Sequence, residues 1–133
     1  MTYEDQDITE HFYSGNKKTI EVTVYNADGS LKDLSNCEIT YVLMNRKDYG
    51  IIYLRKSTHN GVSEIKVTGL GTCEIYLYGA DTYNLYGKFR HHVNVVDENG
   101  DEETVLTGLV EIHKTSAFRL RRVVQQAYLQ GNI

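Results

Sequence analysis

The 133-residue chain lacks several features that would indicate a metal site or a membrane protein. It has only two cysteines, Cys37 and Cys73, which are too few and too far apart in the sequence for a zinc site. No apolar run approaches the roughly 18 residues of a membrane-spanning helix, so we expect no membrane partner. The first residues are acidic and polar, so we expect no signal peptide and synthesis in a cytosol.

Each cysteine begins a run of alternating apolar residues. The two could face each other across a β-sandwich and form a disulfide, or they could stay reduced as small buried side chains. The reduced state suits a protein made in a cytosol.

Signatures of catalysis are also missing. No serine lies in a nucleophile-elbow pattern, and no glycine-rich loop leads into a helix where it could hold phosphate. His91 and His92 are neighbours in an alternating run, so their side chains would point to opposite faces and could not share one metal ion. His11, His59 and His113 lie in separate segments. We therefore predict no enzymatic activity, no catalytic residue, no metal site and no cofactor.

The chain is instead rich in runs that alternate apolar and polar residues, a pattern typical of β-strands with one buried face. Strands are expected at 18–25, 37–45, 51–56, 62–67 and 73–78, followed by a closing pair at 89–95 and 106–112, and residues 8–13 could add an eighth. Val42 and Met44 predict that the second strand is covered on both faces, and Leu31 and Leu34 are spaced to close the edge of the core. The residues expected to face the core are Ile20, Val22, Val24, Cys37, Ile39, Tyr41, Leu43, Cys73, Ile75, Leu77, Phe89, His91, Val93, Val95, Leu106, Val110 and Ile112.

The most distinctive stretch is the closing pair within residues 80–114. Its turn is Glu98-Asn99-Gly100-Asp101, and Asn-Gly is a strong hairpin signal because both residues tolerate positive φ. A lone hairpin is not stable and needs an opposing sheet, which the earlier strands can supply. Turn signals recur about every 8–12 residues, which is typical of an antiparallel sandwich. We therefore predict a single all-β domain.

Charge is distributed unevenly along the chain. Residues 1–111 hold all 18 acidic side chains and 10 of the 14 basic ones, a net charge of −8, whereas residues 112–133 hold four basic side chains and no acidic one. A basic tail on an acidic body indicates a segment that docks on another acidic surface, including a second copy, or else a solvated terminus. Because the body is acidic and the tail is a small basic footprint, we expect no nucleic-acid partner.

Residues 116–130 break the strand pattern and predict a short helix or an extended arm, with Gln and Ala favouring the helix. Their apolar side chains need a partner surface, either on the same sandwich or on another protein. Aromatic and arginine anchors carry most of the energy of protein interfaces. The residues expected in such an interface are Phe118, Arg119, Leu120, Arg121, Arg122, Val124 and Tyr128.

Two stretches together resemble the Ig-like domain of tailed-bacteriophage virion proteins, such as the N-terminal domain of baseplate upper proteins. The first is KKTIEVTVYNADGSLKDLSNCEITYVL, with a strand, an Asp-Gly turn and a second strand. The second is ADTYNLYGKFRHHVNVVDENGDEETVLTGLVEI, with a corner, a strand, a turn and a closing strand. The resemblance covers residues 17–112 and lies in the order of these motifs.

The corner of this pattern has a physical interpretation. Leu85 can plug the end of the sandwich, Gly87 lets the chain turn closely, and Phe89 begins the strand. Ig-like domains often have, at the position of Phe89, a tyrosine whose hydroxyl ties back to the preceding loop. Phenylalanine cannot make that bond, so we expect Asp81 and Thr82 to hold the corner. The chain has no tryptophan, so kinship with antibody domains is not implied.

The resemblance implies an Ig-like antiparallel β-sandwich of about seven strands at 17–112, with an N-terminal arm at 1–16 and a basic docking arm at 113–133. The protein would be an oligomeric structural component of a virion, made in the host cytoplasm. It would dock on other virion proteins of the baseplate, tail or capsid, including head-fibre and decoration roles. The alternative is a module that binds a glycan on a host surface through exposed tyrosines. The candidate tyrosines are Tyr49, Tyr53, Tyr76, Tyr78, Tyr83 and Tyr86.

Overall fold

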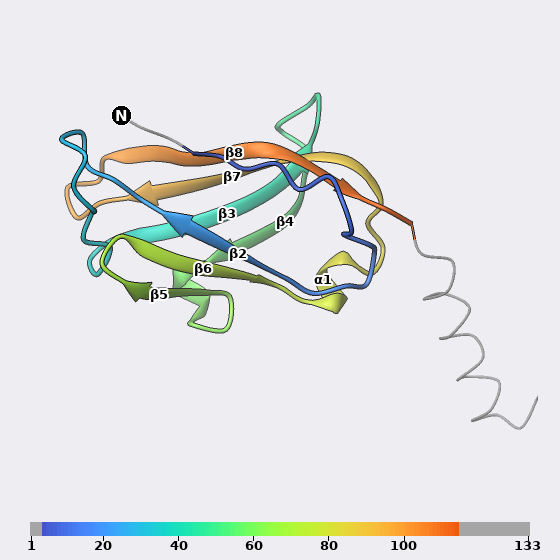
Figure 1. Ribbon diagram of the computed structural model, residues 1–133, viewed down its shortest axis with the longest axis horizontal. Helices are drawn as coiled ribbons and strands as arrows, with labels where there is room; N and C mark the ends of the chain where they lie inside the picture. The colour runs from blue at the N-terminus through green and yellow to red at the C-terminus, as the bar shows by residue number, and fades with distance from the viewer. Residues whose placement is uncertain (1–3, 115–133) are drawn as a thin grey trace, which may run out of the picture.

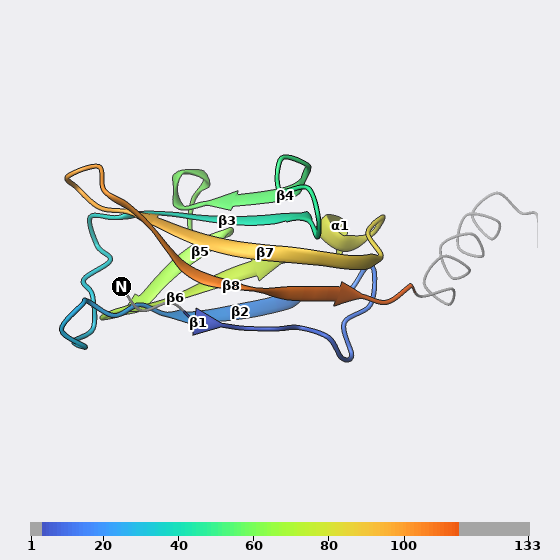
Figure 2. The same cartoon turned by 90° about the horizontal axis from the view of Figure 1, so that it is seen from above.

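The computed structural model describes residues 4–114, which form two β-sheets packed face to face (Figures 1 and 2). One sheet has five strands in the order β1–β8–β7–β3–β4, and the other has three in the order β2–β6–β5. The strands are β1 (Glu4–Asp5), β2 (Lys18–Thr23), β3 (Glu38–Asn45), β4 (Ile52–Ser57), β5 (Ile65–Gly69), β6 (Thr72–Leu77), β7 (Gly87–Val96) and β8 (Glu102–Ile112). The short helices are η1 (Thr58–Asn60) and α1 (Gly79–Thr82). The predicted all-β sandwich is confirmed.

The chain crosses repeatedly between the two sheets. It passes from β2 in the three-stranded sheet to β3 in the five-stranded sheet, and later from β6 back across to β7. Neighbouring strands are antiparallel except at β1, which runs parallel to β8. A third crossing runs from β4 through η1 to β5, and the core lies between the two sheets.

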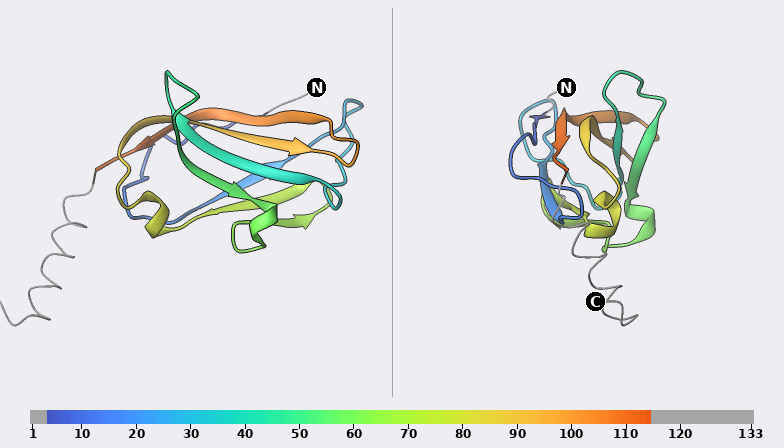
Figure 3. Two further views of the ribbon diagram at one scale, coloured as in Figure 1. Left: turned by 180° about the vertical axis from the view of Figure 1, so that it is seen from behind. Right: turned by 90° about the vertical axis from the view of Figure 1, so that its right-hand side faces the viewer.

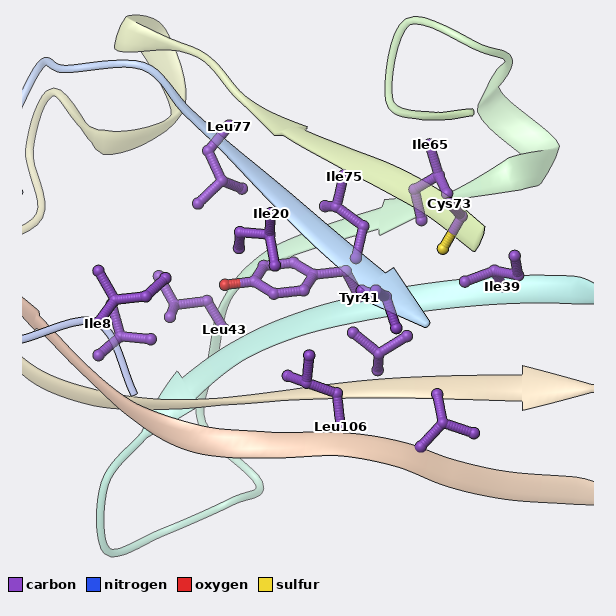
Figure 4. Packing of buried hydrophobic residues seen from close by; sticks show 14 of the residues in the cluster. Ile8, Ile20, Ile39, Tyr41, Leu43, Ile65, Cys73, Ile75, Leu77 and Leu106 are labelled. Carbon is purple, nitrogen blue, oxygen red and sulfur yellow. The ribbon is translucent and has the colours of Figure 1, made fainter. Parts of the chain in front are cut away.

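The core lies between the inner faces of the sheets, and Tyr41 from β3 is at its centre with 0% of its surface exposed (Figure 4). Every residue predicted to face the core is buried except Cys37, which is partly exposed. Burial of each large aliphatic side chain stabilises the fold by roughly 1.5–3 kcal/mol. Val42 and Met44 on the outer face of β3 are also buried, which confirms that this strand is covered on both sides.

The N-terminal segment lies along β8 as an additional parallel strand. Its regular part is Glu4–Asp5, and single bridges join Ile8 to Val110 and Tyr13 to His113. Pairing thus begins upstream of the predicted strand at 8–13. Ile8 and Phe12 enter the core cluster. Residues 4–14 therefore pack as part of the sandwich.

A series of buried hydrogen bonds joins the N-terminal segment to the core. His91 is 0% exposed on the inner face of β7, with Nδ1 3.1 Å from the hydroxyl of Tyr41 and Nε2 2.6 Å from the carbonyl oxygen of Gln6. A carbonyl only accepts, so Nε2 donates and Nδ1 of the neutral ring accepts from Tyr41. Burial lowers the pKa of His91, which favours the neutral ring.

Gly108 on β8 makes this arrangement sterically feasible. It lies opposite His91, and a Cβ atom at this position would be 2.0 Å from the carbonyl oxygen of Gln6. Since that carbonyl turns inward to His91, the backbone N–H of Leu109 donates instead to the carboxylate of Asp7, at 2.8 Å. Gly108 therefore leaves room for the carbonyl of Gln6, and Asp7 accepts the hydrogen bond that this carbonyl no longer accepts from Leu109.

The corner between β6 and β7 is held as expected by Asp81 and Thr82. The hydroxyl of Thr82 accepts from the backbone N–H of Gly15 at 3.0 Å and donates to the carbonyl of Asn16 at 2.9 Å. The carboxylate of Asp81 accepts from the backbone N–H of Tyr78 at 2.8 Å and pairs with Lys56 at 2.6 Å. The corner therefore bonds to the N-terminal segment on one side and to β4 on the other.

Three details differ from the sequence-based expectations. In the β7–β8 turn only Gly100 has positive φ, because the N–H of Gly100 bonds to the carbonyl of Asp97 and the loop closes between Asp97 and Asp101. Leu31 is 38% exposed, so Leu34 alone closes that edge of the core. β5 begins at Ile65 rather than Val62 because η1 and the following turn occupy the preceding residues.

Candidate protein interface

The seven residues predicted to form the interface, Phe118 to Tyr128, lie outside the residues that the structure describes. The structure does show how the chain is held immediately before them. His113 and Ser14 are joined by a backbone bond of 2.9 Å, and Nε2 of His113 is 3.1 Å from the carbonyl of Thr9. The ammonium group of Lys114 lies over the ring of Tyr86, 5.2 Å from its centroid. The predicted arm therefore starts from a fixed point at one end of the sandwich (Figure 1).

The six tyrosines of the glycan hypothesis do not form one platform. Tyr49 and Tyr53 belong to the β3–β4 hairpin, where their rings pack edge-on against His92 and Phe89. Tyr76 and Tyr78 lie together on the other sheet, with ring centroids 6.5 Å apart. The remaining two, Tyr83 and Tyr86, lie in and after the corner that follows α1. The structure thus divides the set among three places.

The β3–β4 loop exposes large apolar side chains. Four large side chains that lie close together in the sequence are each between 43% and 50% exposed: Tyr49, Ile51, Ile52 and Tyr53. Because the ring of Tyr49 contacts His92, whose side chain points outward from β7, this loop folds toward the outer face of the five-stranded sheet. The projecting loop is visible from behind and from the side in Figure 3.

Basic side chains surround this loop. Arg46 and Lys47 follow β3, Arg55 lies on β4, and Arg90 lies on the outer face of β7 two residues before His92. None of these four cations forms an ion pair within residues 4–114. Among the described residues, Nε of Arg90 is buried without a hydrogen-bond partner, and a terminal nitrogen of the same side chain lies 3.5 Å from the hydroxyl of Thr107. We call the surface formed by Arg46, Lys47, Tyr49, Arg55, Arg90 and His92 the basic face.

Acidic side chains gather at the opposite end of the same sheet. The β7–β8 turn and the start of β8 carry Asp97, Glu98, Asp101, Glu102 and Glu103, which we call the acidic end. The turn lies far from the point where the last described residues leave the sandwich (Figure 1). None of these five carboxylates forms an ion pair among the described residues. The five-stranded sheet is therefore oppositely charged at its two ends.

Chemistry-bearing groups are not brought together elsewhere in the described chain. Within residues 4–114, no group of three or more His, Cys, Asp or Glu side chains is placed to hold a metal ion. Cys37 and Cys73 are both free thiols, and burial raises the pKa of Cys73 to about 12.

A surface hollow of about 550 Å³ between the N-terminal segment and β2 is lined mainly by polar and charged side chains. No helix in the described part of the chain is long and apolar enough to cross a membrane.

Comparison with known proteins identified no matching family model and no matching curated protein.

Sequence reasoning missed the basic face, although a signal was present. Arg46 and Lys47 follow one strand, while Lys88 and Arg90 begin another. Antiparallel pairing of these two strands brings such positions to the same end of a sheet. The basic face can be recognised only when the pairing of β3 with β7 is known, and the sequence alone does not show which strands pair.

Proposed function

We propose that this protein is a structural component of a tailed-phage virion and docks on other virion proteins through residues 115–133. The observation that supports the proposal is that residues 4–114 enclose a hydrophobic core of their own. The buried cluster of the described chain runs from Ile8 to Ile112 and includes strands of both sheets. Because the described residues have this core of their own, we propose that the basic, aromatic segment serves to bind a partner.

The chemistry of the segment supports an acidic protein partner. Phe118, Leu120, Val124 and Tyr128 supply apolar contact, and the three arginines between residues 119 and 122 supply charge. Arginine and aromatic residues are the most frequent energetic anchors of protein interfaces. The order of strand and turn motifs that resembles Ig-like virion domains supports the virion setting.

The solution mass of three chains tests the docking role. The chains are the full protein, a version that ends at Lys114, and a full-length variant with Arg119→Gln, Arg121→Gln and Arg122→Gln. At low micromolar concentration we expect an oligomer for the full chain and a folded monomer for the shortened chain, with the triple variant shifted toward monomer. A matched control with Lys17→Gln and Lys18→Gln should behave as the full chain. Equal oligomers from the full and shortened chains, measured by light scattering on a sizing column, would exclude the docking role.

A further inference from the structure

The opposite charges of the basic face and the acidic end make the five-stranded sheet complementary to itself. Arg46, Lys47 and Arg55 are exposed and lack carboxylate partners among residues 4–114. At the other end of the sheet, Glu98, Asp101 and Glu102 are exposed and form no ion pair within the described part of the chain. Within residues 4–114 the two groups cannot pair inside one copy, because they lie toward opposite ends of the paired strands β3 and β7.

The basic face also has the composition of a protein interface. Interface centres are enriched in arginine, tyrosine and other aromatic residues. Here the ring of Tyr49 packs on His92, and Ile51 and Ile52, close to Tyr49 in the sequence, are also exposed. Exposed isoleucines favour a protein partner over a carbohydrate, since sugars stack on aromatic rings and gain little from aliphatic groups.

We propose that the basic face of one copy binds the acidic end of a second copy, giving a head-to-tail contact between five-stranded sheets. The contact uses surfaces separate from residues 115–133, so it goes beyond the docking role of that segment. The two surfaces are different patches of the same chain, so the contact is heterologous and can extend from copy to copy. A second copy is favoured over an unrelated partner because the chain itself carries the matching charge.

The magnitude of the contact sets the conditions of the test. Exposed ion pairs contribute only about 0.2–1 kcal/mol each, so several are needed and the contact is weak in dilute solution. We expect it at concentrations of hundreds of micromolar and at low salt, where screening between exposed charges is least. Removing two charges from one side should weaken the contact about fivefold or more.

Zero-length cross-linking with a carbodiimide tests the contact on the full chain. This reagent joins an amine to a carboxylate that lies beside it, so Lys47 of one copy should link to Glu98, Asp101 or Glu102 of another. An equal mixture of ordinary and ¹⁵N-labelled protein identifies the links between copies by mass spectrometry. We expect mixed-isotope links whose yield falls at least about fivefold in E98Q/E102Q and in R46Q/R55Q. The matched control, E21Q/K66Q on the other sheet, should keep the full yield.

Mixing the two variants tests direction. In a mixture of unlabelled R46Q/R55Q with labelled E98Q/E102Q, the labelled copy alone has an intact basic face and the unlabelled copy alone has an intact acidic end. The links should therefore join labelled Lys47 to unlabelled Glu98, Asp101 or Glu102 and should not form in the other direction. Links of equal yield in both directions, or no mixed links in native protein, would overturn the proposal. The proposal would also be overturned if the native protein gave no mixed links but bound heparin, and R46Q/R55Q abolished that binding. If the full chain is still an oligomer when these links are missing, only the contact between the basic face and the acidic end is overturned. The docking role of residues 115–133 is tested separately.

Discussion

Gln6 and His91 are 85 positions apart in the sequence, yet Nε2 of the histidine donates to the carbonyl oxygen of Gln6 at 2.6 Å. This bond joins the N-terminal segment to the inner face of the five-stranded sheet. Tyr41 supplies the second partner of the ring from the centre of the core. The imidazole of His91 on β7 therefore joins the N-terminal segment to β3, although the three segments are distant in sequence.

Replacement of His91 by phenylalanine should destabilise the fold strongly. The ring volume is kept, but the carbonyl of Gln6 and the hydroxyl of Tyr41 lose their partners inside the protein. Each unsatisfied buried polar group costs about 1–3 kcal/mol, so we expect a loss of about 2–5 kcal/mol in the free energy of unfolding. Urea unfolding measures it, with the exposed His59→Gln as control. A loss below about 0.5 kcal/mol would show that the chain of bonds contributes little.

Stability should fall as the pH drops below the ordinary pKa of histidine, 6.5. Burial lowers the pKa of His91 in the folded protein, so below pH 6.5 the unfolded chain binds more protons than the folded one. The free energy of unfolding is therefore highest above pH 6.5 and decreases until the pH passes the lowered value. His92, whose pKa burial also lowers, contributes in the same direction.

Urea unfolding between pH 7.5 and pH 5 should show this slope, and His91→Phe should have a smaller one. Arg90 and His92 disfavour a charge on His91, while Asp7 and the carbonyl of Gln6 favour it. Equal slopes for the native protein and the variant would assign the pH dependence to other groups.

Gly108→Ala should release the N-terminal segment. The added Cβ would lie 2.0 Å from the carbonyl oxygen of Gln6, a distance that requires the segment to move. Hydrogen exchange should show lost protection at the amide of Ile8, which donates to the carbonyl of Leu109 at 2.8 Å in the native fold. Amides of β3 should remain protected. Unchanged exchange at Ile8 would contradict the close approach of the two strands.

Lys56 and Asp81 should depend on each other for stability. Their side chains are only 6% and 19% exposed and lie 2.6 Å apart, and Lys56 also lies over the ring of Tyr78. Removal of one partner of a buried pair leaves an uncompensated charge and costs about 3–5 kcal/mol, and we expect somewhat less here because Asp81 is partly exposed. Lys56→Met with Asp81→Asn should cost less than the sum of the two single changes. Strict additivity in chemical denaturation would argue against the pairing.

The two thiols should differ in reactivity. Burial raises the pKa of both, but that of Cys73 reaches about 12 and its side chain is 1% exposed, whereas Cys37 is partly exposed. The thiolate is the reactive form, so iodoacetamide at pH 8 should modify Cys37 much faster than Cys73. Mass spectrometry after timed quenching gives both rates, and equal rates in the native state would contradict the burial of Cys73.

The sequence predicted the strands well because each inner face repeats with period two. The faces of β2, β3, β6 and β7 follow directly from that alternation. The roles of Asp81 and Thr82 were also predicted, because Phe89 has no hydroxyl for the usual corner bond.

Features that depend on pairing between distant strands were not predictable in the same way. The parallel course of β1 along β8 depends on Gly108 and His91, which carry no local signal for it. The turn at Asn99 and Gly100 follows the bonds between Asp97 and Asp101 rather than the dipeptide alone. The basic face required the pairing of β3 with β7 to become visible.

The function that we propose makes the chain part of a virion, held there by residues 115–133. Mass spectrometry of phage particles, purified from cells that make either the full chain or the chain that ends at Lys114, tests it most directly. We expect the full chain in the particles at a copy number comparable with other structural proteins, and the shortened chain only in the soluble fraction. A full chain that is absent from purified particles, or a shortened chain incorporated equally well, would rule out this role.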